Sequence, residues 1–191
     1  MMKNAKQFRM ESKNALSGKW GLAVAVSFVF GLLFACSTAT LLGSIILGGV
    51  LMVGNAIAFT QLFRTGELKF ENLFAGFSTN NFTATIGLYV KTTLYTFFWS
   101  LLFFIPGIVK AYSYAMAPYI LADNPELTGG EALTASREMM RGKKWRLFCL
   151  DFSFIGWEIL SIFTLGILTL WITPWKAAAI ADFYETVKTE D

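Results

Sequence analysis

The stretch from Trp20 to Phe63, WGLAVAVSFVFGLLFACSTATLLGSIILGGVLMVGNAIAFTQLF, contains no charged residue. A helix needs about 20 apolar residues to span the hydrocarbon core of a bilayer. The stretch is about twice that long, so we expect two membrane-spanning helices joined by a tight turn near residues 40–43. This pair of helices predicts the class of the whole protein, an all-α membrane bundle.

The composition of the whole chain agrees with a membrane location. Of its 191 residues, 55% are hydrophobic and only 15% are charged, whereas a soluble domain has about 25% charged residues. A chain of this length can hold roughly six spans with short connections. We therefore expect residues 1–191 to form a single membrane domain in the cell (plasma) membrane, without a soluble catalytic domain.

Four further spans follow from the apolar segments in the rest of the chain. They are predicted at residues 83–104, 108–122, 145–163 and 167–187. Turns separate them at Ile105-Pro106-Gly107 and Thr164-Leu165-Gly166, and Pro106 suits a first helical turn, where its missing N–H is not needed. The expected fold class is all-α: a polytopic integral membrane bundle of about six transmembrane helices with amphipathic interfacial helices.

Short amphipathic segments lie between the predicted spans, and we expect them to lie in the membrane interface. One of them begins with Thr128-Gly129-Gly130-Glu131, which has the spacing of a helix capping box. The segments Ser12 to Gly18 and Ser136 to Gly142 are equally long, and each leads into a span. They suggest a threefold internal repeat of interfacial helix and helical hairpin over residues 4–63, 68–122 and 129–187. Chance agreement is the alternative.

Lysine and arginine residues gather on one side of the predicted spans. All of the 16 basic residues except Lys91, Lys110 and Lys176 fall there. The positive-inside rule makes this side cytoplasmic, so we expect both termini in the cytoplasm. The candidates for contacts with anionic lipid headgroups are Arg137, Arg141, Lys143, Lys144 and Arg146.

The sequence Pro106-Gly107-Ile108-Val109-Lys110-Ala111-Tyr112-Ser113-Tyr114, continued by Tyr119-Ile120-Leu121-Ala122-Asp123-Asn124-Pro125, resembles a family of small membrane proteins common in Gram-positive bacteria. This is domain-of-unknown-function family 975, and the resemblance is strongest over residues 106–184. It implies a polytopic bacterial membrane protein and implies no activity. Lys143 departs from the family, whose members often carry His there, so the resemblance implies no neutral-pH switch at that position.

Six charged residues fall inside the predicted spans, where a charge is costly and needs a partner or a wet cavity. They are Lys91, Lys110, Asp151, Glu158, Lys176 and Asp182. With about 1.5 Å of rise per residue, Lys91 and Asp151 lie roughly 9–12 Å in from the cytoplasmic side. Opposite charges therefore lie at matching depths on different helices.

Two interpretations of these charges are open. In the first, Lys91 pairs with Asp151 or Asp182, and Lys110 or Lys176 pairs with Glu158, which holds the helices in register. In the second, the charges line a polar pathway or substrate site in which Asp151 and Glu158 carry protons or cations. Asp151 and Glu158 are two helical turns apart and would share one face of a continuous helix.

The sequence excludes most enzyme chemistry. Because it has no His, it lacks Ser-His-Asp and Cys-His nucleophilic pairs and most kinds of zinc site. We expect a non-enzymatic protein, with no cofactor, metal or nucleic-acid partner, that acts through membrane lipids, a membrane-protein partner or a second copy. The alternative is a small permease or export accessory that uses Lys91, Asp151 and Glu158.

Two further patterns have a packing interpretation. Small residues recur every four positions, a spacing that lets helices approach closely, and we expect them to pack inside the bundle. They are Gly31, Ala35, Ala39 and Gly43. Aromatic residues near the span ends are expected to anchor the protein at the membrane interface. They are Tyr112, Tyr114, Tyr119, Trp171 and Trp175.

Overall fold

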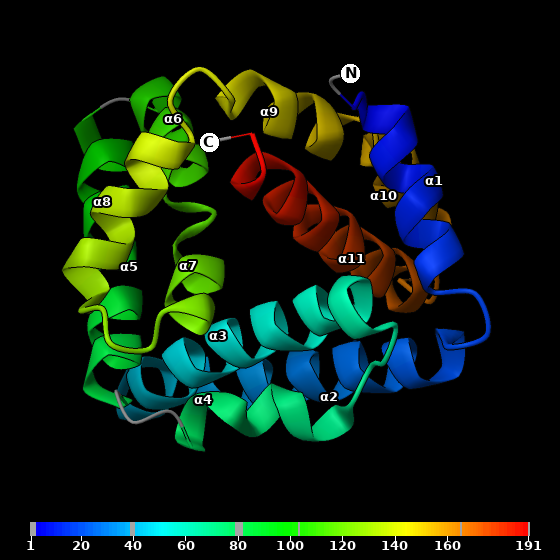
Figure 1. Cartoon of the computed structure of the whole chain (residues 1–191), viewed down its shortest axis with the longest axis horizontal. Coiled ribbons are helices and arrows are strands. Elements are labelled where there is room, and N and C mark those ends of the chain that lie inside the picture. The colour runs from blue at the N-terminus through cyan, green and yellow to red at the C-terminus, as the bar shows by residue number, and fades with distance from the viewer. Residues whose placement is uncertain (1–2, 39–40, 79–81, 103, 165, 191) are drawn as a thin grey trace.

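The computed structural model describes residues 3–38, 41–78, 82–102, 104–164 and 166–190 (Figure 1). Within these ranges the chain forms helices and no strand, which confirms the all-α prediction. Residues 40 and 165 of two predicted turns lie outside the described residues. Pro106 lies in the first turn of a helix, as expected.

The helices follow one another in three groups. In the first, α1 (Ala5–Ala15) precedes α2 (Trp20–Thr38) and α3 (Leu41–Thr65). In the second, the 3₁₀ helix η1 (Phe70–Phe74) and α4 (Ala75–Ser78) precede α5 (Phe82–Leu102), α6 (Phe104–Tyr114) and α7 (Ala117–Asp123). In the third, α8 (Gly129–Met139) precedes α9 (Lys144–Phe152), α10 (Ile155–Phe163) and α11 (Thr169–Lys188).

The turns after α1 and α8 have the same local structure. Gly18 and Gly142 have φ angles of +78° and +77°, in the left-handed region that favours glycine. Leu16 and Met140, which follow the two helices, are fully buried, and each donates its N–H to the carbonyl of the serine four residues earlier. The order of the elements and these two turns agree with the proposed units, and the threefold repeat itself stays a prediction.

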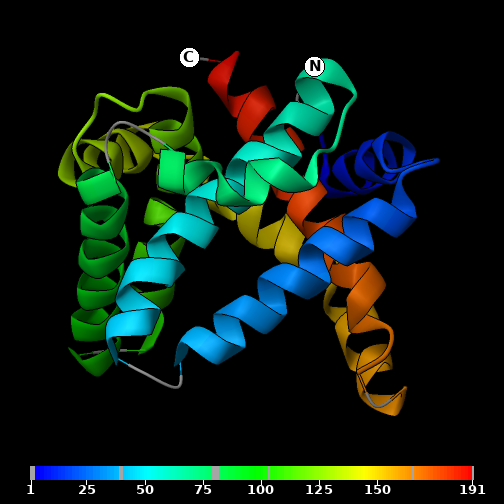
Figure 2. The ribbon, with the colours of Figure 1, turned by 90° about the horizontal axis from the view of Figure 1, so that it is seen from below.

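The hairpin ends and the short amphipathic helices lie at opposite ends of the molecule. In Figure 2 the C-terminal ends of α2, α5 and α10 and the N-terminal ends of α3, α6 and α11 lie toward the lower edge. Helices α1, α4 and α8 and the C-terminal end of α11 lie higher in the same view. The basic segments of the chain thus lie at the end of the molecule opposite the hairpin ends, as the sequence indicates.

The first and last helices pack against each other and close the structure. The rings of Phe8 on α1 and Phe183 on α11 lie 5.4 Å apart, and both side chains are buried. The indole Nε1 of Trp175 donates a hydrogen bond of 2.9 Å to the carbonyl of Arg9. Figure 1 shows α11 running through the middle of the molecule, with α1 along its flank.

By length and composition, few of the described helices qualify as membrane spans. The segment Leu47–Thr65 of α3 qualifies with a mean hydropathy of 1.2, and 61% of it is buried inside the protein. A second span results only if Ala5–Ala15 and Trp20–Cys36, which meet at an angle of 105°, count as one broken span. A buried helix of a water-soluble protein meets the same criterion, so this is weak support for a membrane location.

Two of the six predicted spans are not continuous helices. The segment 108–122 is broken between α6 and α7, and the segment 145–163 is broken between α9 and α10. At about 1.5 Å per residue, α6 with 11 residues and α9 with 9 residues are too short to cross a membrane alone. The expectation of six uninterrupted spans is therefore not met.

The two packing interpretations also need correction. Gly31 and Ala35 are exposed, and a Cβ added to Gly31 would meet nothing within 4 Å, so the internal packing predicted for these two positions is wrong. Ala39 lies outside the described residues. Tyr119 is buried and its ring stacks on that of Tyr184 at 5.2 Å, so it is a core residue rather than an interface anchor. Trp171 is exposed.

Candidate functional site

A cluster of three charged side chains joins α9, α10 and α11. The Nζ of Lys176 lies 2.9 Å from Oε1 of Glu158 and 3.5 Å from Oδ1 of Asp151. The predicted pairing of Lys176 with Glu158 is thus present, and one lysine serves two carboxylates. All three side chains are partly exposed, with 30% for Lys176, 26% for Asp151 and 46% for Glu158.

The break between α9 and α10 separates the two carboxylates onto different helices. A continuous helix would place Asp151 and Glu158 on one face, but the chain turns at Ser153 and Phe154. The guanidinium of Arg9 donates a hydrogen bond of 2.7 Å to the carbonyl of Ser153, which satisfies an acceptor that the break leaves without a helical partner. Helix α1 therefore stabilises the break that shapes the cluster.

The charged cluster faces two cavities of about 480 and 410 Å³. Asp151 lines the larger cavity, and Glu158 and Lys176 line the smaller one. Both cavities have Asn55, Tyr119 and Ile180 in their walls, so they adjoin. The helices that contribute most of the lining, α3, α6, α7 and α11, surround the centre of the view in Figure 1.

Two polar residues of this site were missed at the sequence level. The hydroxyl of Tyr112, expected to be an interface anchor, donates a hydrogen bond of 2.9 Å to Oδ2 of Asp151. Asn55 belongs to the wall between the cavities. An amide in the middle of an otherwise apolar, charge-free stretch was the available signal, because such a group needs a polar partner or water.

Lys91 and Asp182 do not join this cluster, contrary to the predicted pairing. Asp182 is buried, and its Oδ1 lies 3.0 Å from the Nζ of Lys3 in the N-terminal segment. Asp151 pairs with Lys176 instead. The depth estimate failed because it treated each span as a straight helix, whereas the chain folds Lys3 back over α11.

Lys91 and Lys110 instead share a third cavity with Arg137. It has a volume of about 390 Å³ and lies between α5, α6 and α8. Tyr95, Tyr114, Gly130, Leu133 and Thr134 complete its described lining. We name this cavity the basic pocket. The three basic side chains come from three different helices, so the fold and not local sequence brings them together.

The five candidate lipid-contact residues do not form a single surface. Arg137 lines the basic pocket, whereas Arg146 forms an ion pair of 2.6 Å with Glu190 in the C-terminal tail. Arg141 is exposed, and Lys143 and Lys144 are partly exposed at the turn before α9. Arg137 is therefore the one of the five that lines the basic pocket.

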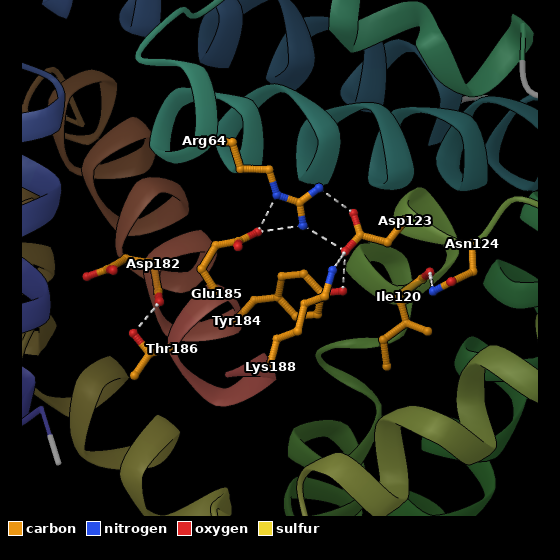
Figure 3. A network of polar contacts seen from close by, with 9 residues as sticks. All are labelled: Arg64, Ile120, Asp123, Asn124, Asp182, Tyr184, Glu185, Thr186 and Lys188. Atoms are coloured by element: carbon orange, nitrogen blue, oxygen red, sulfur yellow. Dashed lines mark hydrogen bonds and ion pairs between the residues drawn. The ribbon is translucent and has the colours of Figure 1, made fainter. Parts of the chain in front are cut away.

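A polar network that the sequence did not suggest ties α3, α7 and α11 together (Figure 3). The guanidinium of Arg64 binds both carboxylate oxygens of Asp123, at 2.8 and 2.7 Å, and its Nε donates to Glu185 at 2.7 Å. The hydroxyl of Tyr184 and the ammonium of Lys188 also donate to Asp123, at 2.8 and 2.6 Å. The position of Asp123 at the end of an apolar run is the signal in the sequence for such a network.

The charge state of Asp123 follows from this network. Burial opposes ionisation, but the hydrogen bonds from Arg64, Lys188 and Tyr184 together outweigh it, so the pKa of Asp123 falls from 3.8 to about 2. Asp123 is therefore a carboxylate at neutral pH, and the network is a set of ionic contacts that joins three helices.

Among the described residues there is no group of three Asp, Glu, Cys or His side chains that could hold a metal ion.

Comparison with known proteins identifies the family. The family model "Protein of unknown function (DUF975)" matches residues 1–113 and 101–191. The two matches together cover the whole chain, so the family likeness extends further toward the N-terminus than the residues first recognised. No curated protein and no solved structure matches the chain. The chain belongs to the DUF975 family.

Proposed function

We propose that the chain is a multi-pass membrane protein of six spans, two of them broken. Large apolar side chains that none of the described residues covers support this placement. Examples are Phe28, Phe97, Phe98, Ile162 and Phe163, and Phe163 is 81% exposed. They lie on α2, α5 and α10, the helices that run toward the hairpin ends in Figure 2. The hydrocarbon core of a bilayer can cover such an apolar surface.

The orientation of the spans follows from charge. The basic segments precede α2, follow α3, connect α8 to α9 and end α11, and the hairpin ends point the other way. The positive-inside rule then puts α1, α8 and both termini in the cytoplasm. Asp123 lies at this cytoplasmic end, directly after the predicted span 108–122.

The function we propose is non-enzymatic: the two adjoining cavities bind a small organic cation, and the protein acts as a permease or as an accessory of one. The observation that carries this proposal is that the cavities reach both Asp151 and Glu158. A dry interior with fully paired charges would instead favour a purely structural role. Lys91, part of the permease alternative at the sequence level, has no place in this mechanism because it lies in the basic pocket.

The electrostatics of the cavities favour a cation. Two carboxylates and one ammonium among the described lining residues give a net charge of −1. The Oδ1 oxygen of Asp151 accepts no hydrogen bond from the described residues, and its ion-pair contact with Lys176, at 3.5 Å, is longer than the contact of 2.9 Å between Lys176 and Glu158. A cation entering the larger cavity can pair with this carboxylate while Lys176 keeps its shorter contact with Glu158. Tyr112 and Tyr119 add aromatic rings, which attract organic cations.

The test is a binding titration of the purified chain in detergent with ethidium, a fluorescent organic cation. We expect wild-type protein to bind ethidium and Asp151→Asn to bind it about tenfold more weakly, since one charged contact is worth roughly 1–2 kcal/mol. Glu67→Gln is the matched control, because Glu67 is an exposed carboxylate that pairs with Lys69 outside the cavities. This control should bind like wild type.

Folding must be followed in the same samples. If the carboxylate serves only to hold helices together, Asp151→Asn lowers the folded yield in membranes, and the folded fraction binds ethidium like wild type. A normal yield with weakened binding, and slower ethidium efflux from proteoliposomes, supports the proposal. Wild-type protein that binds no ethidium contradicts it.

A contact role with lipids is the second candidate, and the basic pocket is the observation that favours it. Three basic residues that converge at the proposed cytoplasmic interface suit an anionic lipid. This role does not compete with cation binding, because the basic pocket and the two central cavities share no described lining residue.

A further inference from the structure

We propose that the basic pocket is a binding site for the phosphate group of an anionic membrane lipid, held by Lys91, Lys110 and Arg137. The proposal rests on the membrane placement argued above and is independent of cation binding in the central cavities. It names a site and a class of ligand for Lys91 and Lys110, which the sequence had assigned to acidic partners, and it gives the lipid contact predicted for Arg137 a defined cavity.

The residue types of the lining are the first argument for this site. Three of the described residues that line the basic pocket are basic and none is acidic. Glu131, at the start of α8, accepts hydrogen bonds from the backbone N–H of Thr128 at 2.7 Å and from its hydroxyl at 2.8 Å, and these bonds together with the charge of Lys91 lower the pKa of Glu131. An anion bound in the pocket would interact favourably with the three basic groups of its lining.

The chemistry of the lining is the second argument. Arginine presents a planar fork that matches phosphate oxygens, and lysine supplies a point charge. The hydroxyl of Thr134 donates to the carbonyl of Gly130 at 3.1 Å, and the rings of Tyr95 and Tyr114 lie 6.1 Å apart beside the cavity. A phosphate group that is joined to an apolar molecule fits this lining, which combines basic groups with aromatic rings.

The close approach of α8 to α5 shapes the pocket. A Cβ on Gly129 would collide with the backbone of Leu88 and Ala84, and a Cβ on Gly130 would lie 2.9 Å from the Nζ of Lys91. The two glycines therefore bring the start of α8 against α5 and leave room beside Lys91. In Figure 2, α8 lies across the upper end of α5, where the proposed interface is.

The apolar surface beside the pocket indicates a lipid rather than a free phosphate compound. Leu94, Phe97 and Phe98 on α5 and Ile108 and Val109 on α6 are exposed. They continue from the level of Lys91 and Lys110 toward the hairpin end of the same two helices. A headgroup in the basic pocket would therefore place its acyl chains along a surface that nothing in the chain covers.

Native mass spectrometry of the full chain tests the proposal. Purified protein is titrated with phosphatidylglycerol, with phosphatidylcholine, and separately with glycerol 3-phosphate and inorganic phosphate. We expect phosphatidylglycerol to bind in preference to phosphatidylcholine, and Arg137→Gln or Lys91→Gln to weaken its binding about five- to tenfold, as about 1 kcal/mol per basic residue implies. Lys91→Arg keeps the charge and should keep the binding.

Arg141→Gln is the matched control, because Arg141 is an exposed basic residue that follows the C-terminal end of α8 and does not line the basic pocket. Equal losses for Arg141→Gln and Arg137→Gln would mean diffuse electrostatic attraction and would overturn the proposal. Equal binding of phosphatidylglycerol and phosphatidylcholine, or binding of the free phosphates without a preference for lipid, would overturn it too. Ethidium binding is measured on the same variants, so that failure of the pocket and failure of the cation cavities can be told apart.

Discussion

At the scale of single residues, Asp123 links three helices. It accepts hydrogen bonds from residues of α3 and α11 while it ends α7. Hydrogen bonds to a charged group are worth about 1.5–3 kcal/mol each when they are lost from a buried site. We expect Asp123→Asn to lower the free energy of unfolding by about 1–3 kcal/mol, measured by thermal unfolding in detergent. Lys69→Gln, which breaks the exposed pair with Glu67, should change it by less than about 0.5 kcal/mol.

The pH dependence of this effect has a defined sign. The folded-state pKa of Asp123, about 2, lies below its ordinary value of 3.8. The ionised carboxylate therefore stabilises the folded state above about pH 4, and this contribution is lost as the pH falls toward 2. The stability difference between wild type and Asp123→Asn should be constant above pH 5 and shrink below pH 4. A stability difference between wild type and Asp123→Asn that grows as the pH falls would contradict the conclusion that Asp123 is ionised in the folded protein.

Which charges lie in apolar segments could be predicted from the sequence, but most of their partners could not. The pair Lys176–Glu158 follows from depth along straight helices. The pair Lys3–Asp182 depends on a chain terminus folding back over α11, and the meeting of Lys91 with Arg137 depends on how α8 lies on α5. Such placements are set by tertiary packing, which leaves no local signature in the sequence.

At the scale of elements, the contact between α8 and α5 depends on one glycine. A Cβ at Gly129 would lie 2.7 Å from the carbonyl oxygen of Ala84 and closer still to the backbone N of Leu88. We expect Gly129→Ala to push α8 away from α5, at a cost of about 1–3 kcal/mol in unfolding free energy, measured by thermal unfolding. Gly87→Ala on α5 is the control. Nothing lies within 4 Å of its added Cβ, so stability should be unchanged or slightly higher because alanine favours a helix.

Helix positions were predicted better than helix continuity. The predicted capping box of Thr128 and Glu131 is present at the start of α8, and α5 covers nearly the same residues as the third predicted span, 83–104. The break between α6 and α7 was missed although Pro118, in the first turn of α7, marks it, because a proline cannot continue a preceding helix. The break between α9 and α10 was missed because no glycine or proline occupies residues 153–154. At Ser153 the break is supported by Arg9 of α1, a contact that hydropathy does not reveal.

At the scale of the whole molecule, the proposed topology predicts which faces are accessible from outside a cell. With Cys36 and Cys149 replaced by Ser, a single cysteine is placed at Thr164, near the hairpin end of α10, or at Glu67, near the basic end of α3. We expect a membrane-impermeant maleimide to label Thr164→Cys in intact cells and Glu67→Cys only after the cells are broken. Labelling of Glu67→Cys in intact cells would reverse or exclude this topology.

The packing of α1 against α11 has a consequence for the synthesis of the protein. The ribosome makes Phe8 on α1 long before its partner Phe183 on α11. Until α9 and α11 have been made, α1 lacks these two partners, and the membrane surface can cover its amphipathic face. Docking of α1 against α11 is therefore a late step of assembly. The charged cluster needs Lys176 of α11 as well as the break that Arg9 supports, so it acquires its final shape only once α11 has been made.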